Sequence, residues 1–395
     1  MQPLAVSAWT LTSALGAGRA ATLDALRSER GGLAPNDFPN VGLDTWIGRV
    51  AGLEEQPLSG DFAAWDCRNH RLANLGIEQD DFAAAVAGAR ERYGADKVGV
   101  FVGTSTSGIG ATERAYRERN AEGELPDWFD YEHSHEMHAL AGFLRARLGL
   151  AGPTLAVSTA CSSSAKAFAT ARRYMQAGLC RAAVAGGVDT LCAMTLYGFH
   201  SLQLLSSKPC RPADAERDGI NLGEAAGFAL LEWPPEAPSA RLQLLGYGES
   251  SDAHHMSAPH PDGLGAKLAM RDALSRAALE PGDIDWVHLH GTGTPANDLA
   301  EDKAVTDLFG AGMACSSTKG WTGHTLGAAG IVNFALGALA IEEGFLPASL
   351  NTRKVDAALA GDIVMENRTA PPRRVLANAF GFGGNNASLV LGAAE

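Results

Sequence analysis

The 395-residue sequence predicts an α/β protein with a largely parallel sheet. Short apolar, β-branched segments alternate with helical segments along the whole chain, a pattern typical of helices packed on parallel strands. The second half also repeats the order of elements of the first in outline. The segments that we expect to be strands are 98–102, 155–159, 182–188, 227–232, 242–248, 286–290, 374–378 and 387–392.

The repeat is clearest where a strand leads through a loop of small residues into a helix. Residues 154–178 have this order, and residues 314–319 enter a glycine-rich loop before a second helix at 328–343. Each half then closes with a strand, at 227–232 and at 387–392. Two packed copies of one α/β unit would bring equivalent loops to a shared centre, and ligands favour loops at the carboxyl ends of strands.

A proline-rich segment at 233–239 is the best candidate for the junction of the halves. We therefore expect an N-terminal half at 1–235 and a C-terminal half at 236–395. A hydrophobic content of 46% with 19% charged residues indicates a compact globular protein with well-buried cores.

Charge and cysteine content narrow the class of protein. The net charge of −13 argues against nucleic-acid binding, which needs clustered Lys and Arg. Neither a signal peptide nor a stretch approaching the roughly 20 apolar residues of a membrane span is visible. The six cysteines show no CxxC spacing, which indicates a reducing compartment. We expect a cytoplasmic protein without membrane insertion.

Cys161 lies where a strand turns into a helix. At such a corner, unpaired N–H groups and the helix dipole favour the thiolate over the thiol. The small neighbours Ala160, Ser162 and Ser163 leave room for a substrate to reach the sulfur. A buried, inert cysteine is the alternative, and position alone does not decide between the two.

Three loops of the second half carry further candidates. His290 ends a strand and precedes a tight turn, Lys319 and His324 flank a short glycine-containing loop, and Phe382 lies in a glycine turn that can offer N–H groups to an oxyanion. Singly, these could be a core histidine, a solvated lysine and a plain hairpin. Together with Cys161 they suit acyl transfer in which both a thiolate and an enolate are stabilised.

Five motifs in order carry a resemblance that covers nearly the whole chain. The sequence resembles the β-ketoacyl-[acyl carrier protein] synthases, the elongating condensing enzymes of bacterial fatty acid and type II polyketide synthesis. The resemblance implies a thiolase-like fold with a five-layered α-β-α-β-α core. The motifs are Thr159-Ala-Cys161-Ser-Ser, Arg211-Pro-Ala-Asp214 with Glu216-Arg-Asp-Gly219, His290-Gly-Thr-Gly-Thr-Pro295, Lys319 with Gly323-His324 and Leu326-Gly-Ala-Ala-Gly330, and Asn378 with Phe380-Gly-Phe-Gly-Gly384.

The resemblance also implies a reaction, the decarboxylative condensation of malonyl carrier protein with an acyl chain held on the cysteine. The two histidines would stabilise the enolate as neutral donors, which burial favours by lowering their pKa. The implied roles are nucleophile for Cys161, enolate stabilisation for His290 and His324, orientation of the histidines by Lys319 paired with Glu301, oxyanion-hole N–H groups from Cys161 and Phe382, a moving gate at Phe382, and a supporting position for Phe380.

The chain departs from the family pattern at three positions. Asn333 stands where many members carry a glutamate that helps to bind a structural cation, so we expect no metal. Asn385 stands where threonine is usual. Thr106 replaces an apolar residue at the base of the acyl pocket, and the polar run 132–138, which begins a helix or binds a metal, should flank that pocket across a dimer. These departures suggest the hypothesis of a specialised pathway such as aryl polyene assembly, with housekeeping elongation as the alternative.

The implied partners are acyl- and malonyl-loaded acyl carrier proteins, which bring the substrates on their phosphopantetheine arm, so that no other cofactor is expected. Carrier proteins are acidic, and docking on an acidic chain needs a local basic patch, for which Arg68, Arg71, Lys208 and Arg211 are the matching candidates. Arg211 could equally hold its own turn. The family's pocket is completed across a two-fold, so we expect a homodimer, with a heterodimer of related subunits as the alternative.

Three other functions stay open. A thiolase would place a second cysteine in the last glycine turn, where this chain has Phe382. A non-catalytic partner subunit, like the chain-length factors, would lack the nucleophile that Cys161 supplies. A cysteine hydrolase would need a general-base dyad in place of two histidines that face an oxyanion.

Overall fold

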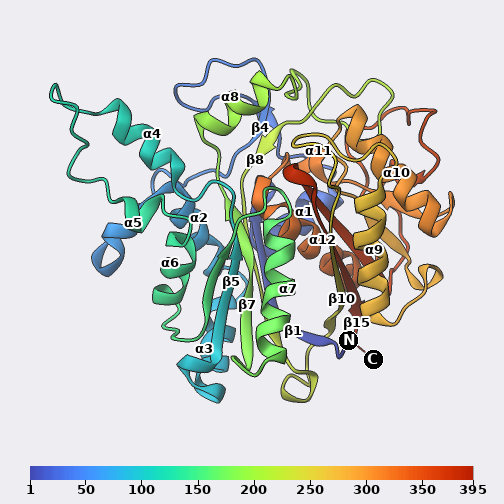
Figure 1. Cartoon of the computed structure of the whole chain (residues 1–395), viewed down its shortest axis with the longest axis horizontal. Helices are drawn as coiled ribbons and strands as arrows, with labels where there is room; N and C mark the ends of the chain where they lie inside the picture. The colour runs from blue at the N-terminus through green and yellow to red at the C-terminus, as the bar shows by residue number, and fades with distance from the viewer. Residues whose placement is uncertain (395) are drawn as a thin grey trace.

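The computed structural model describes residues 1–394 and contains the repeat in its strand order (Figure 1). The first half orders its strands β6-β5-β7-β9-β1, and the second half orders the equivalent strands β12-β11-β14-β15-β10, with β13 beyond β12. These strands are β1 (Leu4–Ser13), β5 (Val98–Gly103), β6 (Thr154–Val157), β7 (Ala182–Asp189), β9 (Ala225–Glu232), β10 (Leu242–Ser251), β11 (Trp286–His288), β12 (Ala314–Ser316), β13 (Asp362–Ile363), β14 (Arg374–Gly381) and β15 (Asn385–Ala393).

Strand direction repeats as well. β5 is parallel to β6 and β7, β9 is antiparallel to β7 and β1, and the five equivalent strands of the second half pair in the same way. The sheet is therefore mixed, and our expectation of a largely parallel sheet was wrong. Only three residues, Phe382–Gly384, connect β14 to β15, and so short a connection forces antiparallel pairing.

The two sheets meet where β1 pairs with β10, through Leu4–Val6 and Leu242–Leu244. This contact joins them into one hydrogen-bonded set of 12 strands that includes the short β2 (Gly16–Ala17). A separate small sheet orders its strands β3 (Ala34–Pro35), β4 (Trp46–Gly48) and β8 (Leu222–Gly223).

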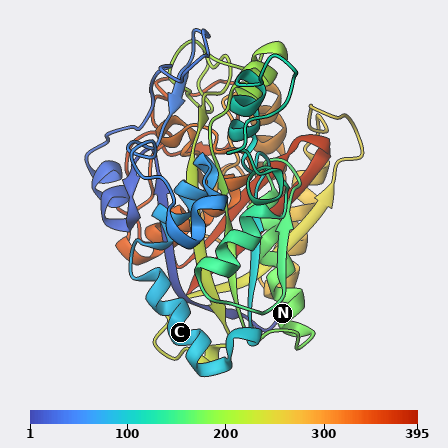
Figure 2. The same ribbon diagram turned by 90° about the vertical axis from the view of Figure 1, so that its left-hand side faces the viewer.

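Helices fill the space between the sheets and cover both outer faces, which confirms the five-layered arrangement (Figures 1 and 2). The three large hydrophobic clusters correspond to the interfaces between these layers. The central helices are α7 (Ser163–Gln176) and α12 (Ala329–Glu343); α2 (Arg68–Ile77), α3 (Phe82–Tyr93) and α6 (Ala139–Arg147) cover the first sheet, and α9 (Leu264–Ala277) and α10 (Pro295–Phe309) cover the second.

The other helices lie at the ends of the layers. α4 and α5 extend away from the sheets at the upper left of Figure 1. Within residues 1–394, one helical segment, Leu326–Glu343, is long and apolar enough to cross a membrane. It consists of α12, one of the two central helices, with the turn before it, and 83% of it is buried in the protein. These other helices are α1 (Gly18–Arg27), α4 (Ile109–Arg117), α5 (Tyr131–Ser134), α8 (Ala193–Ser201) and α11 (Lys319–Thr322).

The central helices approach each other closely because small residues line their contact. A Cβ added at Gly330 would lie 2.4 Å from the backbone nitrogen of Ala165. The Ser164 hydroxyl accepts a hydrogen bond of 2.9 Å from the Ile331 N–H, and the rings of Phe168 and Phe334 pack with centroids 4.4 Å apart. This approach brings together the loops that precede the two helices, one from each half.

Candidate active site

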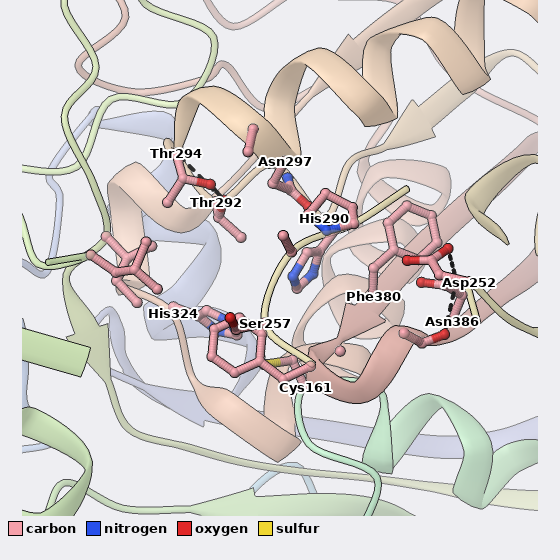
Figure 3. A pocket seen from close by; sticks show the side chains of 18 of the residues that line it. Cys161, Asp252, Ser257, His290, Thr292, Thr294, Asn297, His324, Phe380 and Asn386 are labelled. Carbon is pink, nitrogen blue, oxygen red and sulfur yellow. Dashed lines mark hydrogen bonds between the residues drawn. The ribbon is translucent and has the colours of Figure 1, made fainter. Parts of the chain in front are cut away.

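A cavity of about 340 Å³ lies where the loops of the two halves meet. Figure 3 shows Cys161, His290 and His324 at this cavity, with Phe380, Asp252 and Asn386 to one side. Cys161 comes from the loop before α7, His290 follows β11, and His324 precedes α12. The structure therefore brings the cysteine and both histidines together around one space.

Cys161 stands on a strained turn between β6 and α7. Ala160 has a φ of +51°, an uncommon conformation for a residue with a side chain, and its carbonyl accepts the Ser163 N–H at 3.1 Å. Strain of this kind persists where the surrounding structure fixes it, and it is found often at functional sites. The side chain of Cys161 lines the cavity, although the residue is only 6% exposed.

The ionisation state of Cys161 differs from our expectation of a thiolate. Burial raises the pKa of the thiol to about 12, which outweighs the Lys319 charge and the backbone N–H groups of Phe382 and Cys161 that lower it. The resting residue is therefore a thiol. The helix N-terminus favours the thiolate, but the desolvation of the buried sulfur favours the thiol more strongly.

The glycine turn after β14 packs directly against the cysteine elbow. A Cβ at Gly381 would lie 2.8 Å from the Thr159 carbonyl oxygen and 3.1 Å from the Cys161 nitrogen. Only glycine permits so close an approach. The approach places the N–H of Phe382 within hydrogen-bonding reach of the Cys161 sulfur. The Phe382 side chain turns toward Phe199, with ring centroids 5.6 Å apart, and both rings line the cavity.

His324 has a fixed tautomer. The N–H of Leu326 donates to Nδ1 of His324 at 3.2 Å, so the ring carries its proton on Nε2. Burial first, and the Lys319 charge second, lower the pKa of His324 well below its usual value. His324 is therefore a neutral hydrogen-bond donor at this cavity.

His290 is arranged in the same way through Lys319. The Lys319 ammonium lies 3.4 Å from Nδ1 of His290 and donates to the His290 carbonyl oxygen. Because an ammonium can only donate, Nδ1 accepts and Nε2 keeps the proton. Burial, with smaller contributions from Lys319 and His324, lowers the pKa of His290 well below its usual value. Its ring centroid is 5.3 Å from that of His324.

Glu301 does not pair with Lys319 as we expected. Its carboxylate accepts the backbone N–H groups of His290 at 2.7 Å and Gly291 at 2.8 Å, and the Asn378 amide at 3.1 Å. Within residues 1–394, no ion pair joins the two side chains. Glu301 therefore holds the backbone of the His290 turn, while its charge acts on Lys319 only at longer range.

Burial also affects the proton on Lys319. It lowers the pKa of the ammonium to about 8, against the opposing charge of Glu301. Phe380 lies beside His290, with the two ring centroids 5.8 Å apart, and lines the cavity.

Thr106 does not line the described cavity, and its hydroxyl is already bound. Its Oγ1 donates to the buried carboxylate of Asp189 at 2.7 Å, and its N–H donates to the same oxygen at 2.9 Å. The polar atom that we assigned to the acyl pocket therefore faces the protein interior. The Thr106 hydroxyl therefore gives no argument for a polar acyl pocket, because it is bound to an internal acceptor that the sequence does not show.

Two of the four expected docking cations are bound to carboxylates. Arg68 is 17% exposed and holds the fully buried Glu224 through bonds of 2.6 and 2.8 Å. Arg71 binds Asp66 through bonds of 2.6 and 2.5 Å. These arginines fix the start of α2, and we withdraw them as a docking patch.

The other two docking candidates differ from each other. Lys208 is exposed, and no salt bridge involves it in the part of the chain that the structure describes. Arg211 is mostly buried and lies 3.3 Å from Glu216 in its own turn, which favours its structural role.

Asn333 uses its side chain within the protein. Its amide donates to the carbonyl oxygens of Leu289 at 3.1 Å and Asn378 at 2.8 Å, and thereby links the loop after β11 to β14. No group of three or more His, Cys, Asp and Glu side chains suited to a metal occurs among residues 1–394.

The polar run 132–138 begins within helix α5, where the Asp130 side chain accepts the His133 N–H.

Our sequence analysis missed the polar lining of the cavity and the buried Asp189. Thr292 and Thr294 stand inside the His290 motif and could have been found there, whereas Ser257 and Asn297 carried no signal. Asp189 ends an apolar strand, and a charged residue at the carboxyl end of a strand was the available signal.

Two segments of the chain match models of a known protein family. Residues 70–237 match the family described as Beta-ketoacyl synthase, N-terminal domain, and residues 242–353 match Beta-ketoacyl synthase, C-terminal domain. The chain is 38% identical over 275 residues to the mitochondrial 3-oxoacyl-[acyl-carrier-protein] synthase of Arabidopsis thaliana, across 63% of this chain and 58% of that protein. It is 37% identical over 332 residues to 3-oxoacyl-[acyl-carrier-protein] synthase 2 of Rhizobium meliloti, across 79% of this chain and 78% of that protein.

Among solved structures, the chain is similar to the ketosynthase ApeO of Xenorhabdus doucetiae, solved in complex with its chain length factor ApeC. The TM-score is 0.90 at 36% identity, and the similarity covers 100% of this chain and 98% of that one.

Proposed function

This chain belongs to the β-ketoacyl synthase family, and from that premise we propose how its residues divide the condensing reaction. It is a condensing acyltransferase of fatty acid or polyketide elongation. We assign the nucleophile to Cys161, enolate stabilisation to His290 and His324, orientation of His290 to Lys319, and the oxyanion hole and gate to the Phe382 turn.

In the first half-reaction, the Cys161 sulfur attacks the thioester carbonyl of an acyl carrier protein. A new carbon–sulfur bond forms, the bond to the carrier sulfur breaks, and the thiol proton of Cys161 passes to the departing carrier thiolate. The N–H groups of Cys161 and Phe382 point to the space at the sulfur. The carbonyl oxygen of a thioester bound there would become the tetrahedral oxyanion, and these N–H groups would donate to it. Such donors typically contribute about 2.7–4 kcal/mol each.

In the second half-reaction, the malonyl carbon loses CO2, and the electron pair of the broken bond becomes an enolate. The Nε2–H groups of His290 and His324 donate to the thioester oxygen that carries this charge. The enolate carbon attacks the acyl carbonyl, the carbon–sulfur bond to Cys161 breaks, and the released thiolate takes a proton. The product is a β-ketoacyl chain on the carrier protein.

One observation supports this assignment best. Both histidines have Nδ1 occupied by a donor, so two neutral Nε2–H groups remain beside a reactive sulfur. A non-catalytic partner subunit, the alternative function, would need neither the cysteine nor this tautomer control.

Mass spectrometry of the protein with acyl carrier protein tests the proposal. We expect an acyl adduct on Cys161 that malonyl carrier protein then extends, and no adduct in Cys161→Ala. His324→Ala should form the adduct but fail to extend it. A wild-type protein without any adduct would favour the non-catalytic subunit, and release of free acid would favour a hydrolase.

We also propose a dimer that brings two related subunits together. β6 is an edge strand with half-buried apolar residues, including Leu155 and Val157, and no strand pairs with its outer edge within residues 1–394. A homodimer or a heterodimer would cover this edge, and the solved ApeO complex contains a chain length factor. Sedimentation of the chain alone and with a co-expressed related subunit distinguishes the two.

The acyl chain is a separate proposal. We retain a specialised type II pathway such as aryl polyene assembly as the hypothesis, with housekeeping elongation as the alternative; Thr106 no longer supports it, and the full-length similarity to ApeO supports a ketosynthase that works beside a chain length factor. Competition between saturated medium-chain and aryl-polyenoyl carriers tests it, and faster elongation of the saturated chain would refute it. We further propose a cytoplasmic protein, because all six cysteines are free and buried. We also propose that the two halves are residues 1–235 and 236–395, because β10, the first strand of the second half, begins at Leu242.

A further inference from the structure

Asp189 collects an unusual number of hydrogen bonds at the end of β7. The residue is 0% exposed, and its carboxylate accepts from both Thr106 and Ser105. Ser105 donates through its N–H at 3.0 Å and its hydroxyl at 2.6 Å, and the Thr104 hydroxyl donates at 2.7 Å. A buried carboxylate held this way has its oxygens satisfied by hydrogen bonds, and it fixes the loop that donates to it.

One donor to Asp189 comes from the other half of the molecule. The N–H of Gly327, in the turn after His324, binds the carboxylate, and it also lies 3.2 Å from the Ser105 hydroxyl. A Cβ at residue 327 would lie 2.6 Å from the Asp189 carboxylate oxygen and 2.8 Å from the Ser105 nitrogen. Glycine is therefore required for this approach, and Asp189 links a loop of the first half to the His324 turn of the second.

The residue before Gly327 controls the proton on His324. Leu326 has a φ of +52°, a conformation that costs free energy of order 1–3 kcal/mol for a residue with a side chain. In this conformation its N–H donates to Nδ1 of His324, which leaves the ring proton on Nε2. The strained turn is adjacent to the hydrogen bond that Gly327 makes with Asp189.

We propose that Asp189 is a positioning residue for the condensation step: by holding Gly327 it keeps Leu326 in the strained turn that fixes the Nε2–H tautomer of His324. The inference rests on the proposed function for the role of His324, although the control of the tautomer itself does not. Asp189 touches no substrate and acts only through the turn.

The direct test replaces the carboxylate by an amide of the same shape, in Asp189→Asn. The amide cannot accept all of these donors, so the Leu326 turn relaxes and His324 loses its fixed tautomer. We expect malonyl decarboxylation to fall by about 10²-fold, the loss typical of a misplaced oxyanion donor. Acylation of Cys161 does not use His324, and the Asp189 carboxylate contributes to the raised pKa of the thiol, so acylation should not fall in this variant.

A spectroscopic measurement separates positioning from a general structural role. In protein with ¹⁵N-labelled histidine, the wild-type His324 should show a protonated Nε2 and an unprotonated Nδ1, and Asp189→Asn should show a mixture. This measurement needs no catalytic activity, so failure of the proposed function would not affect it. An unchanged His324 tautomer in a folded Asp189→Asn variant would overturn the inference.

Two further variants keep the test decisive. Glu232→Gln is the matched control, because Glu232 is also a buried carboxylate that binds a hydroxyl, and it lies at the other end of the strands, seven pairing positions away at roughly 3.3 Å each. It should leave the ratio of decarboxylation to acylation unchanged.

If Asp189→Asn does not fold, Ser105→Ala removes the hydroxyl that donates to Asp189 at 2.6 Å and accepts the Gly327 N–H at 3.2 Å, and it keeps the carboxylate. We expect a smaller selective loss of decarboxylation with this variant. An equal loss of both half-reactions, or no loss of either, would overturn the inference.

Discussion

At the scale of single residues, burial sets every protonation state at the site. It raises the pKa of the Cys161 thiol to about 12, lowers the pKa of Lys319 to about 8, and keeps His290 and His324 neutral. The two half-reactions therefore depend on different protons. Acylation needs the Cys161 proton to leave, whereas decarboxylation needs the Lys319 proton to stay.

We predict opposite pH dependences for the two half-reactions. As pH rises through about 8, Lys319 becomes a neutral amine that can accept as well as donate, so Nδ1 of His290 is no longer held as an acceptor and decarboxylation should fall. Acylation should rise over the same range because the Cys161 thiol has a pKa of about 12. Separate initial rates of CO2 release and of adduct formation measure this.

The Cys161→Ala variant is the control, since its decarboxylation cannot reflect the thiol. If its CO2 release increased as pH rose through about 8, Lys319 would not have the assigned role.

At the scale of elements, the turn between β14 and β15 and the elbow before α7 depend on each other. The close approach at Gly381 carries the Phe382 N–H to the sulfur, while Gly383 and Gly384 adopt φ values of +76° and +70° that complete the turn. The Lys166 ammonium on α7 binds the side chain of Asn385 at 3.1 Å. Asn385, at the position where threonine is usual, thus connects the turn to α7.

We predict that Gly381→Ala slows acylation of Cys161 by about 10²-fold, because the new Cβ would displace the Phe382 N–H from the oxyanion position. Adduct formation followed by mass spectrometry measures the loss. Gly312→Ala is the control, since a Cβ there meets nothing within 4 Å and residue 312 has no positive φ. Equal rates for both variants would contradict the role of the Gly381 contact.

At the scale of the whole molecule, the contact between α7 and α12 makes the site possible. Cys161 belongs to one half and His324 to the other, and each lies just before its central helix. The distance between the helices therefore sets the distance between nucleophile and enolate donors. Ala165 and Gly330 keep that distance short.

We predict that Gly330→Ala destabilises the protein by about 1–3 kcal/mol, because the added methyl meets the Ala165 backbone and the helices must separate. Denaturant unfolding followed by circular dichroism measures the change. Gly88→Ala, in the middle of α3, is the matched control, because its nearest neighbour is the flexible Arg92 side chain at 3.5 Å. It should gain roughly 0.5–1 kcal/mol from helix propensity.

The sequence alone determined the duplicated α/β halves, because apolar segments and their loops repeat in order along the chain. It also identified Cys161, His290, Lys319 and His324, since these residue types stand in local motifs where elements end. Local signals of this kind need no knowledge of what packs against them.

Only the tertiary structure decided what each group contacts. The acceptor of the Thr106 hydroxyl and the carboxylate partner of Arg68 lie far away along the chain, and the groups that Glu301 binds lie outside its own helix. The thiol state of Cys161 likewise depends on how completely the folded chain removes water from the sulfur. Ionisation and hydrogen bonding are set by the surrounding atoms, and those atoms come together only when the two halves pack.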